Sequence, residues 1–115
     1  MRRAAVALLR VGIIARAAKI MNSQIPNSSF YVDGFTDNIG NAARNKTLSQ
    51  ARAQAVVNLL IKDGVSKDRL LARGFGNQYP KCTNGTEAGR QCNRRVEVSI
   101  RNVNQKQEGN SLPVK

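Results

Sequence analysis

Residues 30–64 decide the fold of this chain; they read FYVDGFTDNIGNAARNKTLSQARAQAVVNLLIKDG. Residues 30–33, at the start of this stretch, include aromatic and β-branched side chains and predict a short strand that ends at the following glycine. The polar residues 37–45 predict a loop. Residues 45–63 then predict a helix, and Gly64 suits its C-terminal cap. The stretch therefore predicts a strand, a loop and a helix in succession.

The segments on either side predict one more helix and two more strands. Residues 6–21 place five apolar side chains on one face of an amphipathic helix: Val6, Leu9, Ile13, Ala17 and Ile20. Residues 70–75 predict a strand. Residues 94–101 alternate, so that one face of a strand carries Val96, Val98 and Ile100. Residues 77–93 predict a long loop because they contain a proline, two glycines and little periodicity.

The N-terminus permits two interpretations. Arg2 and Arg3, followed by the apolar run AAVALL, resemble the start of a signal peptide, and Ala15–Ala17 resembles its cleavage site. Arg10 interrupts the apolar run and Arg16 stands inside the supposed cleavage site, so the helix is the favoured interpretation. A membrane-spanning helix is not predicted, because the longest apolar runs are far shorter than the roughly 18 residues it needs.

The composition of the chain excludes several kinds of active site. Its 115 residues are 41% hydrophobic, which suffices for one modest core in a single domain. The absence of histidine excludes histidine general bases, Ser-His-Asp triads and histidine metal ligands. Two cysteines cannot complete a structural zinc site by themselves. We therefore expect no enzyme, no catalytic residue, no metal and no cofactor.

Arg52 stands inside the apolar stripe of the predicted second helix. The other members of that stripe are Leu48, Ala55, Val56, Leu59 and Leu60. Val57 and Ile61 fall on the opposite, polar side, and the pattern does not explain them. A guanidinium that faces a core is costly unless an anion pairs with it. Arg52 therefore forms either a structural ion pair, with its stem reaching toward water, or a ligand clamp with a loop carboxylate, most obviously Asp37.

Three motifs in order along the chain carry a resemblance to a known family. They are GFTDNIG at residues 34–40, LSQARA at 48–53 and NRRVEV at 93–98. At these separations they closely resemble the core signature of OmpA-like C-terminal domains, which occur in peptidoglycan-associated lipoproteins and in flagellar stator proteins. The resemblance covers about residues 11–100 and includes further matches at Asn45, Gly64, Val65, Arg69, Gly74–Gly76 and Pro80.

The resemblance implies an α+β fold, a two-layer α/β sandwich in which a mixed sheet packs against two main helices. It also implies non-catalytic binding of peptidoglycan through its stem peptide. In the family, a loop aspartate and a helix arginine hold the amine and the carboxylate of diaminopimelate, and Asp37 and Arg52 match these two residues. Four further positions match residues that line the binding site or stand at its rim: Asn45, Arg94, Ile39 and Leu48.

Elementary chemistry favours the same pair of residues. The end of a zwitterionic ligand requires one anion and one cation at a fixed separation, and arginine offers a planar fork that binds a carboxylate in a bidentate manner. Binding would complete a cluster of four charges. A ligand clamp therefore explains why Arg52 is tolerated in an apolar stripe better than a structural ion pair does.

The chain departs from the family in three respects. Phe35 replaces the usual histidine of the G-H-T-D motif. Residues 1–10 do not look like the first family strand, which is therefore missing or atypical, and we interpret them as an unusual leader or a truncated start. Residues 11–101 then form the OmpA-like domain, and the polar residues 102–115 form a flexible tail. The formal charge of +12 is high, with five basic residues before the first acid, Asp33.

The resemblance also implies a partner and a location. Peptidoglycan is the expected partner, the parent protein is expected to be associated with the outer membrane, and the expected location is the periplasm at the bacterial cell envelope. A homodimer stays open. Cys82 and Cys92 bracket the predicted loop, and an envelope family favours a disulfide between them over two free thiols.

Two other functions compete with peptidoglycan binding. The charge of +12 is compatible with a small nucleic-acid-binding protein, but the basic residues are spread along the chain and aromatics are only 4%, so we expect no nucleic acid partner. An enzyme acting on peptidoglycan through paired carboxylates would need two converging acids. Only Asp33 and Asp37 lie close together in the sequence.

Overall fold

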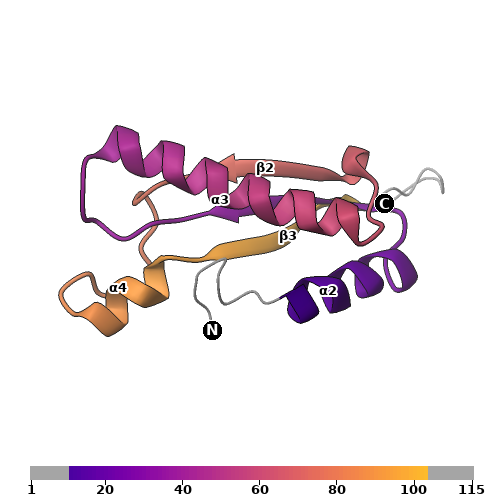
Figure 1. The fold of residues 1–115 in the computed structure, drawn as a ribbon, viewed down its shortest axis with the longest axis horizontal. Helices are drawn as coiled ribbons and strands as arrows, with labels where there is room; N and C mark the ends of the chain where they lie inside the picture. Colours follow the sequence, from indigo (N-terminus) through magenta and orange to yellow (C-terminus); the bar gives the residue numbers. More distant parts are fainter. Residues whose placement is uncertain (1–10, 104–115) are drawn as a thin grey trace.

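A computed structural model describes residues 11–103 of the chain, and Figure 1 shows its ribbon. The described part has a three-stranded sheet in the order β2-β1-β3. Its elements, in chain order, are α2 (Val11–Ser23), β1 (Ser28–Gly34), α3 (Ala42–Lys62), the 3-10 helix η1 (Lys67–Arg69), β2 (Leu70–Gly74), α4 (Glu87–Asn93) and β3 (Val96–Val103). The expected α+β fold, a mixed sheet packed against two main helices, is confirmed.

Strand β1 lies in the middle of the sheet, parallel to β2 and antiparallel to β3. Because side chains alternate along a strand, one face of β1 carries Phe30 and Val32, which are both buried. Phe30 is paired with Leu70 on one side and Ile100 on the other, and Val32 is paired with Val98. All three strands thus contribute to one apolar face, against which α2 and α3 pack.

Two glycines allow the ends of β1 and β2 to approach α3 closely. A Cβ atom on Gly34 would lie 2.1 Å from the backbone oxygen of Ser49, and a Cβ atom on Gly74 would lie 2.4 Å from the backbone nitrogen of Gln50. Alanine at either position would therefore clash with helix backbone, which cannot yield as a flexible side chain can. This close approach places the loop that follows β1 directly against the first half of α3.

The predicted buried face of α2 was wrong at Ile13 and Ile20, whereas Ala17 is partly buried against the core. The buried residues are Ile14, Ala18 and Met21, whereas Ile13 and Ile20 are exposed. Helix α2 has apolar residues on two neighbouring faces, so spacing alone could not decide which of them packs against α3. The predicted start of this helix at Val6 lies outside the described residues.

The predicted apolar stripe of α3 was wrong in part. The buried residues of this helix are Asn45, Ser49, Ala53, Val56, Val57 and Leu60. Val57, which the pattern placed on the polar side, lies in the core, while Leu48 is 38% exposed. The small side chains of Ser49 and Ala53 face the sheet because the glycines at its strand ends bring helix and sheet so close. A pattern weighted by large apolar residues does not detect such a contact.

The sequence predicted a loop throughout residues 77–93, and this prediction was wrong for the last part of the segment. They end in α4, a helix of seven residues. Thr86 caps this helix, because its hydroxyl oxygen accepts a hydrogen bond from the backbone nitrogen of Gly89 at 3.0 Å. Glu87 supplies the acidic first turn. The prediction gave more weight to the glycines of the segment than to this capping signal.

A disulfide and a buried amide hold α4 in place. Cys82 and Cys92 form the expected disulfide, with 6.1 Å between their Cα atoms. The side-chain oxygen of the fully buried Asn93 accepts from the backbone nitrogens of Lys81 and Cys82 at 2.8 and 2.9 Å. Its nitrogen donates to the oxygens of Cys82 and Asn84 at 3.0 and 2.9 Å. Both features fix the residue that follows α4, which is Arg94.

Arg69 closes the opposite end of the sheet. Its Nε donates to the carbonyl of Ser28 at 2.8 Å, and its Nη2 donates to the carbonyls of Met21 and Ile25, both at 2.9 Å. Its Nη1 donates to the side-chain oxygen of Asn22 at 2.6 Å. This one side chain therefore ties η1 to the end of α2 and to the turn before β1.

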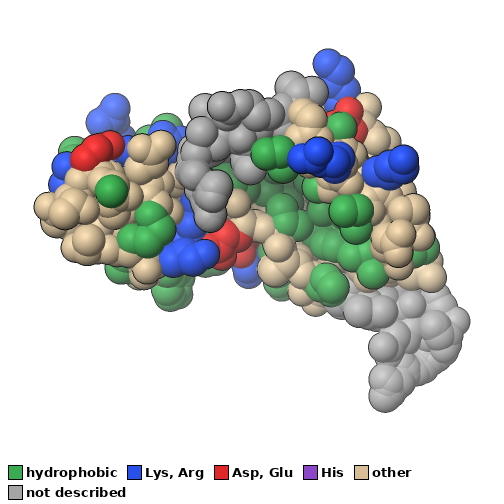
Figure 2. Space-filling view, turned by 90° about the horizontal axis from the view of Figure 1, so that it is seen from below, with side chains coloured by type: hydrophobic (Ala, Val, Ile, Leu, Met, Phe, Trp, Pro, Cys, Tyr) green, Lys and Arg blue, Asp and Glu red, His purple; other side chains and the backbone are tan. Residues whose placement is uncertain are grey.

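The helix-side face of β3 is covered only in part. Val98 and Ile100 lie on the face shared with Phe30 and Val32, as their alternation predicted, yet they are 44% and 51% exposed. Figure 2 shows hydrophobic side chains gathered on the half of the molecule that holds α2. Residues 1–10, where an atypical first strand was considered, lie outside the described residues.

Among residues 11–103, no helix combines the length and the apolar character that crossing a membrane requires.

Candidate functional site

The loop after β1, the start of β3 and α4 meet at one end of the sheet, on the left of Figure 1. Backbone hydrogen bonds hold the loop on both sides. The backbone nitrogen of Phe35 donates to the carbonyl oxygen of Arg95 at 2.9 Å, and that of Thr36 donates to the carbonyl oxygen of Gly76 at 2.8 Å. Thr36 and Asp37 are both buried. The backbone of the loop is therefore fixed before any ligand is present.

The carboxylate of Asp37 accepts two hydrogen bonds from the protein. Its Oδ1 accepts from the backbone nitrogen of Ile39 at 3.0 Å, and its Oδ2 accepts from Nη1 of Arg94 at 2.5 Å. The Asp37 side chain is only 11% exposed. Each carboxylate oxygen has two lone-pair positions, so Asp37 keeps room for another donor.

Asn45, in the first turns of α3, is hydrogen-bonded to the backbone of the loop. Its side-chain nitrogen donates to the carbonyl of Ile39 at 2.9 Å, with a longer contact of 3.5 Å to the carbonyl of Asp37. It is 4% exposed. The structure thus places Asn45 against the loop, as a polar residue of the same cluster.

Arg52 lies two turns after Asn45 on α3 and is half-buried. Its Nη1 atom is buried and, within the described part of the chain, has no hydrogen-bond partner. Burial lowers the pKa of Arg52, the positive charge of Arg94 lowers it further, and the negative charge of Asp37 opposes both effects. The Arg52 guanidinium therefore lies within electrostatic reach of Arg94 and Asp37, but nothing in the described residues bonds its buried Nη1.

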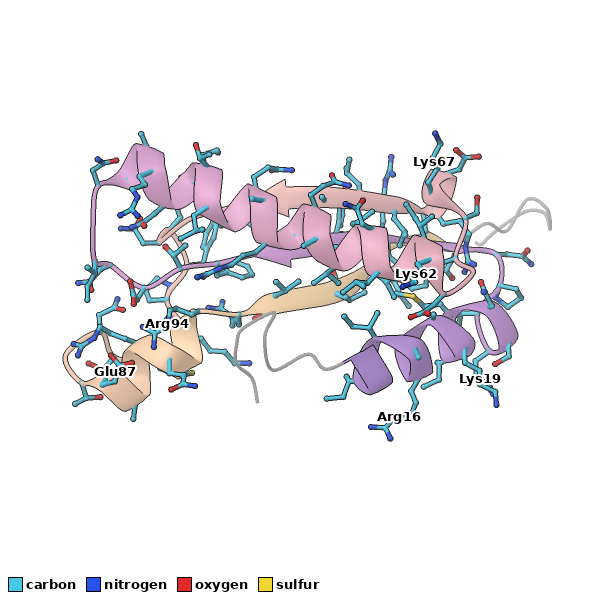
Figure 3. The ribbon with its side chains drawn as sticks, viewed as in Figure 1. Arg16, Lys19, Lys62, Lys67, Glu87 and Arg94 are labelled. Carbon is cyan, nitrogen blue, oxygen red and sulfur yellow. A yellow bond between two sulfur atoms is a disulfide. The ribbon has the colours of Figure 1, made fainter. Side chains whose placement is uncertain are left out.

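Arg94, which caps the C-terminal end of α4, bridges two carboxylates. Its Nη1 donates to Asp37 and its Nη2 donates to Oε2 of Glu87, each at 2.5 Å. The hydrogen bond to Glu87 is the main cause that raises the pKa of Arg94, and Asp37 adds to it against the effect of burial. Figure 3 shows Glu87 and Arg94 close together beside α4. Arg94 was identified from the sequence, but Glu87 was missed, because the only sequence signal for Glu87 was the helix-capping pattern of α4.

Two apolar side chains stand at the surface of this cluster. Ile39 of the loop is 62% exposed, and Leu48 of α3, which lies between Asn45 and Arg52 in sequence, is 38% exposed. The structure thus leaves both predicted pocket residues accessible. A hollow of about 200 Å³ between the start of α3 and the turn after β2 is lined by other residues: Ala42, Ala43, Lys46, Phe75, Asn77 and Gln78.

Phe35, which stands where the family has histidine, belongs to the packing beneath the loop. It is 5% exposed, its ring is stacked on Phe75 with 5.6 Å between centroids, and the Arg95 guanidinium lies 3.9 Å from its centroid. This aromatic and cation–π packing supports the loop without contributing a polar group to the site.

Asp33, the other acid near Asp37 in the sequence, is engaged by an arginine of the neighbouring strand. Arg73 holds both oxygens of Asp33, with Nε at 2.7 Å and Nη2 at 2.9 Å. Asp33 is therefore one half of a bidentate ion pair between β1 and β2. The paired-carboxylate mechanism loses its second acid.

Comparisons with known proteins agree with this architecture. The family model described as the OmpA family matches residues 9–94. Outer membrane porin F of Pseudomonas fluorescens is 49% identical over 78 residues, which are 68% of this chain and 24% of that protein. The peptidoglycan-binding protein ArfA of Mycobacterium tuberculosis is 37% identical over 75 residues, which are 65% of this chain and 23% of that protein. The chain thus spans about a quarter of the length of these relatives.

A solved structure extends the comparison to three dimensions. The peptidoglycan-associated lipoprotein of Burkholderia pseudomallei superimposes with a TM-score of 0.74 at 28% identity, covering 78% of this chain and 75% of that one. The sandwich of sheet and helices is therefore common to both proteins.

Proposed function

The chain belongs to the OmpA family, and we propose that residues 11–101 bind peptidoglycan through a stem peptide of the diaminopimelate type. Among the relatives of this chain are the peptidoglycan-binding protein ArfA and a peptidoglycan-associated lipoprotein, which support a binding domain and not an enzyme. In this proposal the domain anchors an envelope protein to the cell wall from the periplasmic side of the outer membrane.

One observation carries the proposal: among the described residues the buried Nη1 of Arg52 has no hydrogen-bond partner, although Asp37 lies within electrostatic reach. A buried guanidinium nitrogen without an acceptor is costly, by about 1–3 kcal/mol for an unsatisfied polar group and more for a charged one. A structural ion pair would have removed that cost in the free protein. A ligand carboxylate would remove it on binding.

The chemistry of the cluster suits an amino-acid terminus. A ligand carboxylate would accept hydrogen bonds from Arg52, and the neighbouring ammonium group would donate to the free lone pairs of Asp37. Hydrogen bonds to charged groups contribute about 1.5–3 kcal/mol each. The carbon that bears both groups in diaminopimelate would then lie between the loop and α3.

The other predicted site residues support these two. Asn45 holds the loop in the shape that presents Asp37, and Arg94 binds the Asp37 carboxylate at the rim. Ile39 and Leu48 offer apolar surface for the aliphatic chain of the ligand.

A sedimentation assay with purified sacculi tests the proposal. The full chain should co-sediment, and Arg52→Gln and Asp37→Asn should each reduce the bound fraction strongly, by roughly tenfold or more in affinity. Arg16→Gln, which removes one positive charge from an exposed position on α2, should bind like the parent (Figure 3). The clamp assignment is wrong if both site variants sediment as well as the parent.

A titration of the same variants with DNA at several salt concentrations tests the competing function. Binding to DNA that falls steeply with salt and survives Asp37→Asn would instead favour a nucleic-acid-binding protein, for which the charge of +12 is the motivation.

A further inference from the structure

Glu87 is an acid beside the site that the proposed clamp does not use. It opens α4, and its side chain is 64% exposed. Its Oε2 accepts from Nη2 of Arg94 at 2.5 Å, and its Oε1 accepts from Nε of Arg90 at 3.2 Å. Arg94 is thus shared between two anions, with Glu87 on one nitrogen and Asp37 on the other.

The sharing matters because Arg94 and a ligand ammonium would contact the same carboxylate. If Asp37 were the sole anion beside Arg94, this pair would be neutral and would attract an incoming ammonium only weakly. Glu87 offsets the charge of Arg94, so the negative charge of Asp37 stays available to a second cation. Arg90 donates its Nε to the other oxygen of Glu87 and its Nη1 to the carbonyl of Asn84 at 3.0 Å, so Glu87 is shared between Arg90 and Arg94.

Charge counting gives the same result for the bound state. With a zwitterionic ligand end in place, Arg52, Arg94, the ligand ammonium and Arg90, which is paired with Glu87, supply four positive charges. Asp37, Glu87 and the ligand carboxylate supply three negative charges. Without Glu87 the excess of positive charge beside Asp37 would rise from one to two, which is unfavourable for binding an ammonium group.

We propose that Glu87 is a positioning residue that makes the site selective for a ligand with an ammonium group beside its carboxylate. It acts through Arg94 and does not touch the ligand. The inference rests on the proposed function, since it concerns the charge balance of the same clamp.

Calorimetric titration of the full chain with meso-diaminopimelate tests this role. Glu87→Gln should weaken binding about fivefold, the upper range for one exposed ion pair. The same substitution in an Arg94→Gln background should have no further effect, because Arg94 transmits its influence. Glu87→Asp, which keeps the charge, should recover most of the affinity.

Asp68→Asn serves as the matched control. Asp68 is exposed on η1, at the opposite end of the sheet, and its substitution removes the same charge without touching Arg94. Its affinity should equal that of the parent, and circular dichroism should show every variant to be folded.

The outcomes separate the inference from the proposed function. Unchanged affinity of Glu87→Gln, or an equal loss in the Arg94→Gln background, would overturn the role of Glu87 and leave the clamp in place. A parent chain that does not bind meso-diaminopimelate, or that binds equally well after Arg52→Gln, would overturn the diaminopimelate clamp itself.

Discussion

Arg69 and Arg52 lie at opposite ends of the sheet and are used in opposite ways. Every side-chain nitrogen of Arg69 donates to an acceptor of the protein, three of which are backbone carbonyls. Arg52 has a buried nitrogen to which no group within residues 11–103 is hydrogen-bonded, and burial lowers its pKa. The Arg69 end is therefore completed by folding, whereas in the proposed clamp the charge at the Arg52 end is completed by an anion of the ligand.

The largest effect on stability is expected at the Arg69 end. Arg69→Ala leaves the carbonyls of Met21, Ile25 and Ser28 without this donor, and we expect the free energy of unfolding to fall by about 3 kcal/mol. Urea denaturation measures this. Lys67→Ala, an exposed neighbour on η1, should change stability by less than about 0.5 kcal/mol. A loss below about 1 kcal/mol for Arg69→Ala would show that water replaces its hydrogen bonds.

The next effect is expected where the disulfide holds α4. Replacing Cys82 and Cys92 by serine should lower the free energy of unfolding by about 2 kcal/mol in the chain-entropy view. Because Arg94 directly follows α4, the affinity for sacculi should fall as well. Denaturation and sedimentation of the same variant check both effects. Unchanged affinity would show that Asn93 alone holds α4 in place.

The smallest effect on stability is expected at Arg52. Arg52→Met removes a desolvated charge and keeps the aliphatic stem, so the free energy of unfolding should stay within about 1 kcal/mol of the parent or rise. Sacculus binding should nevertheless be lost. If this variant were destabilised as strongly as Arg69→Ala, Arg52 would be a structural residue and the contrast between the two ends would disappear.

The fold was largely predictable because its strongest signals are local. The strand at residues 30–33, the helix that ends before Gly64 and the alternation of residues 94–101 all match β1, α3 and β3 within a few residues. The buried faces of α2 and α3 were less predictable. They depend on how closely Gly34 and Gly74 let the sheet approach α3, which is a property of the assembled layers.

The candidate site was predictable from one inconsistency and one resemblance. A charge in an apolar stripe identified Arg52, and the family motif supplied Asp37, Asn45 and Arg94. Neither source could supply Glu87. The contact of Glu87 with Arg94 depends on α4. This helix was not predicted, because the glycines around its capping pattern favoured a loop.

The most direct measurement is the NMR signal of the Arg52 side chain during a titration with meso-diaminopimelate. A ligand carboxylate that accepts a hydrogen bond from Nη1 of Arg52 should shift the Arg52 Nε–Hε resonance. It should also shift the backbone amide resonance of Ile39, because this amide donates to the Asp37 carboxylate. Arg69 should stay unchanged in the same spectra. If the ligand binds while the Arg52 and Ile39 resonances do not shift, Arg52 and Asp37 do not bind the ligand, and the proposed clamp is wrong.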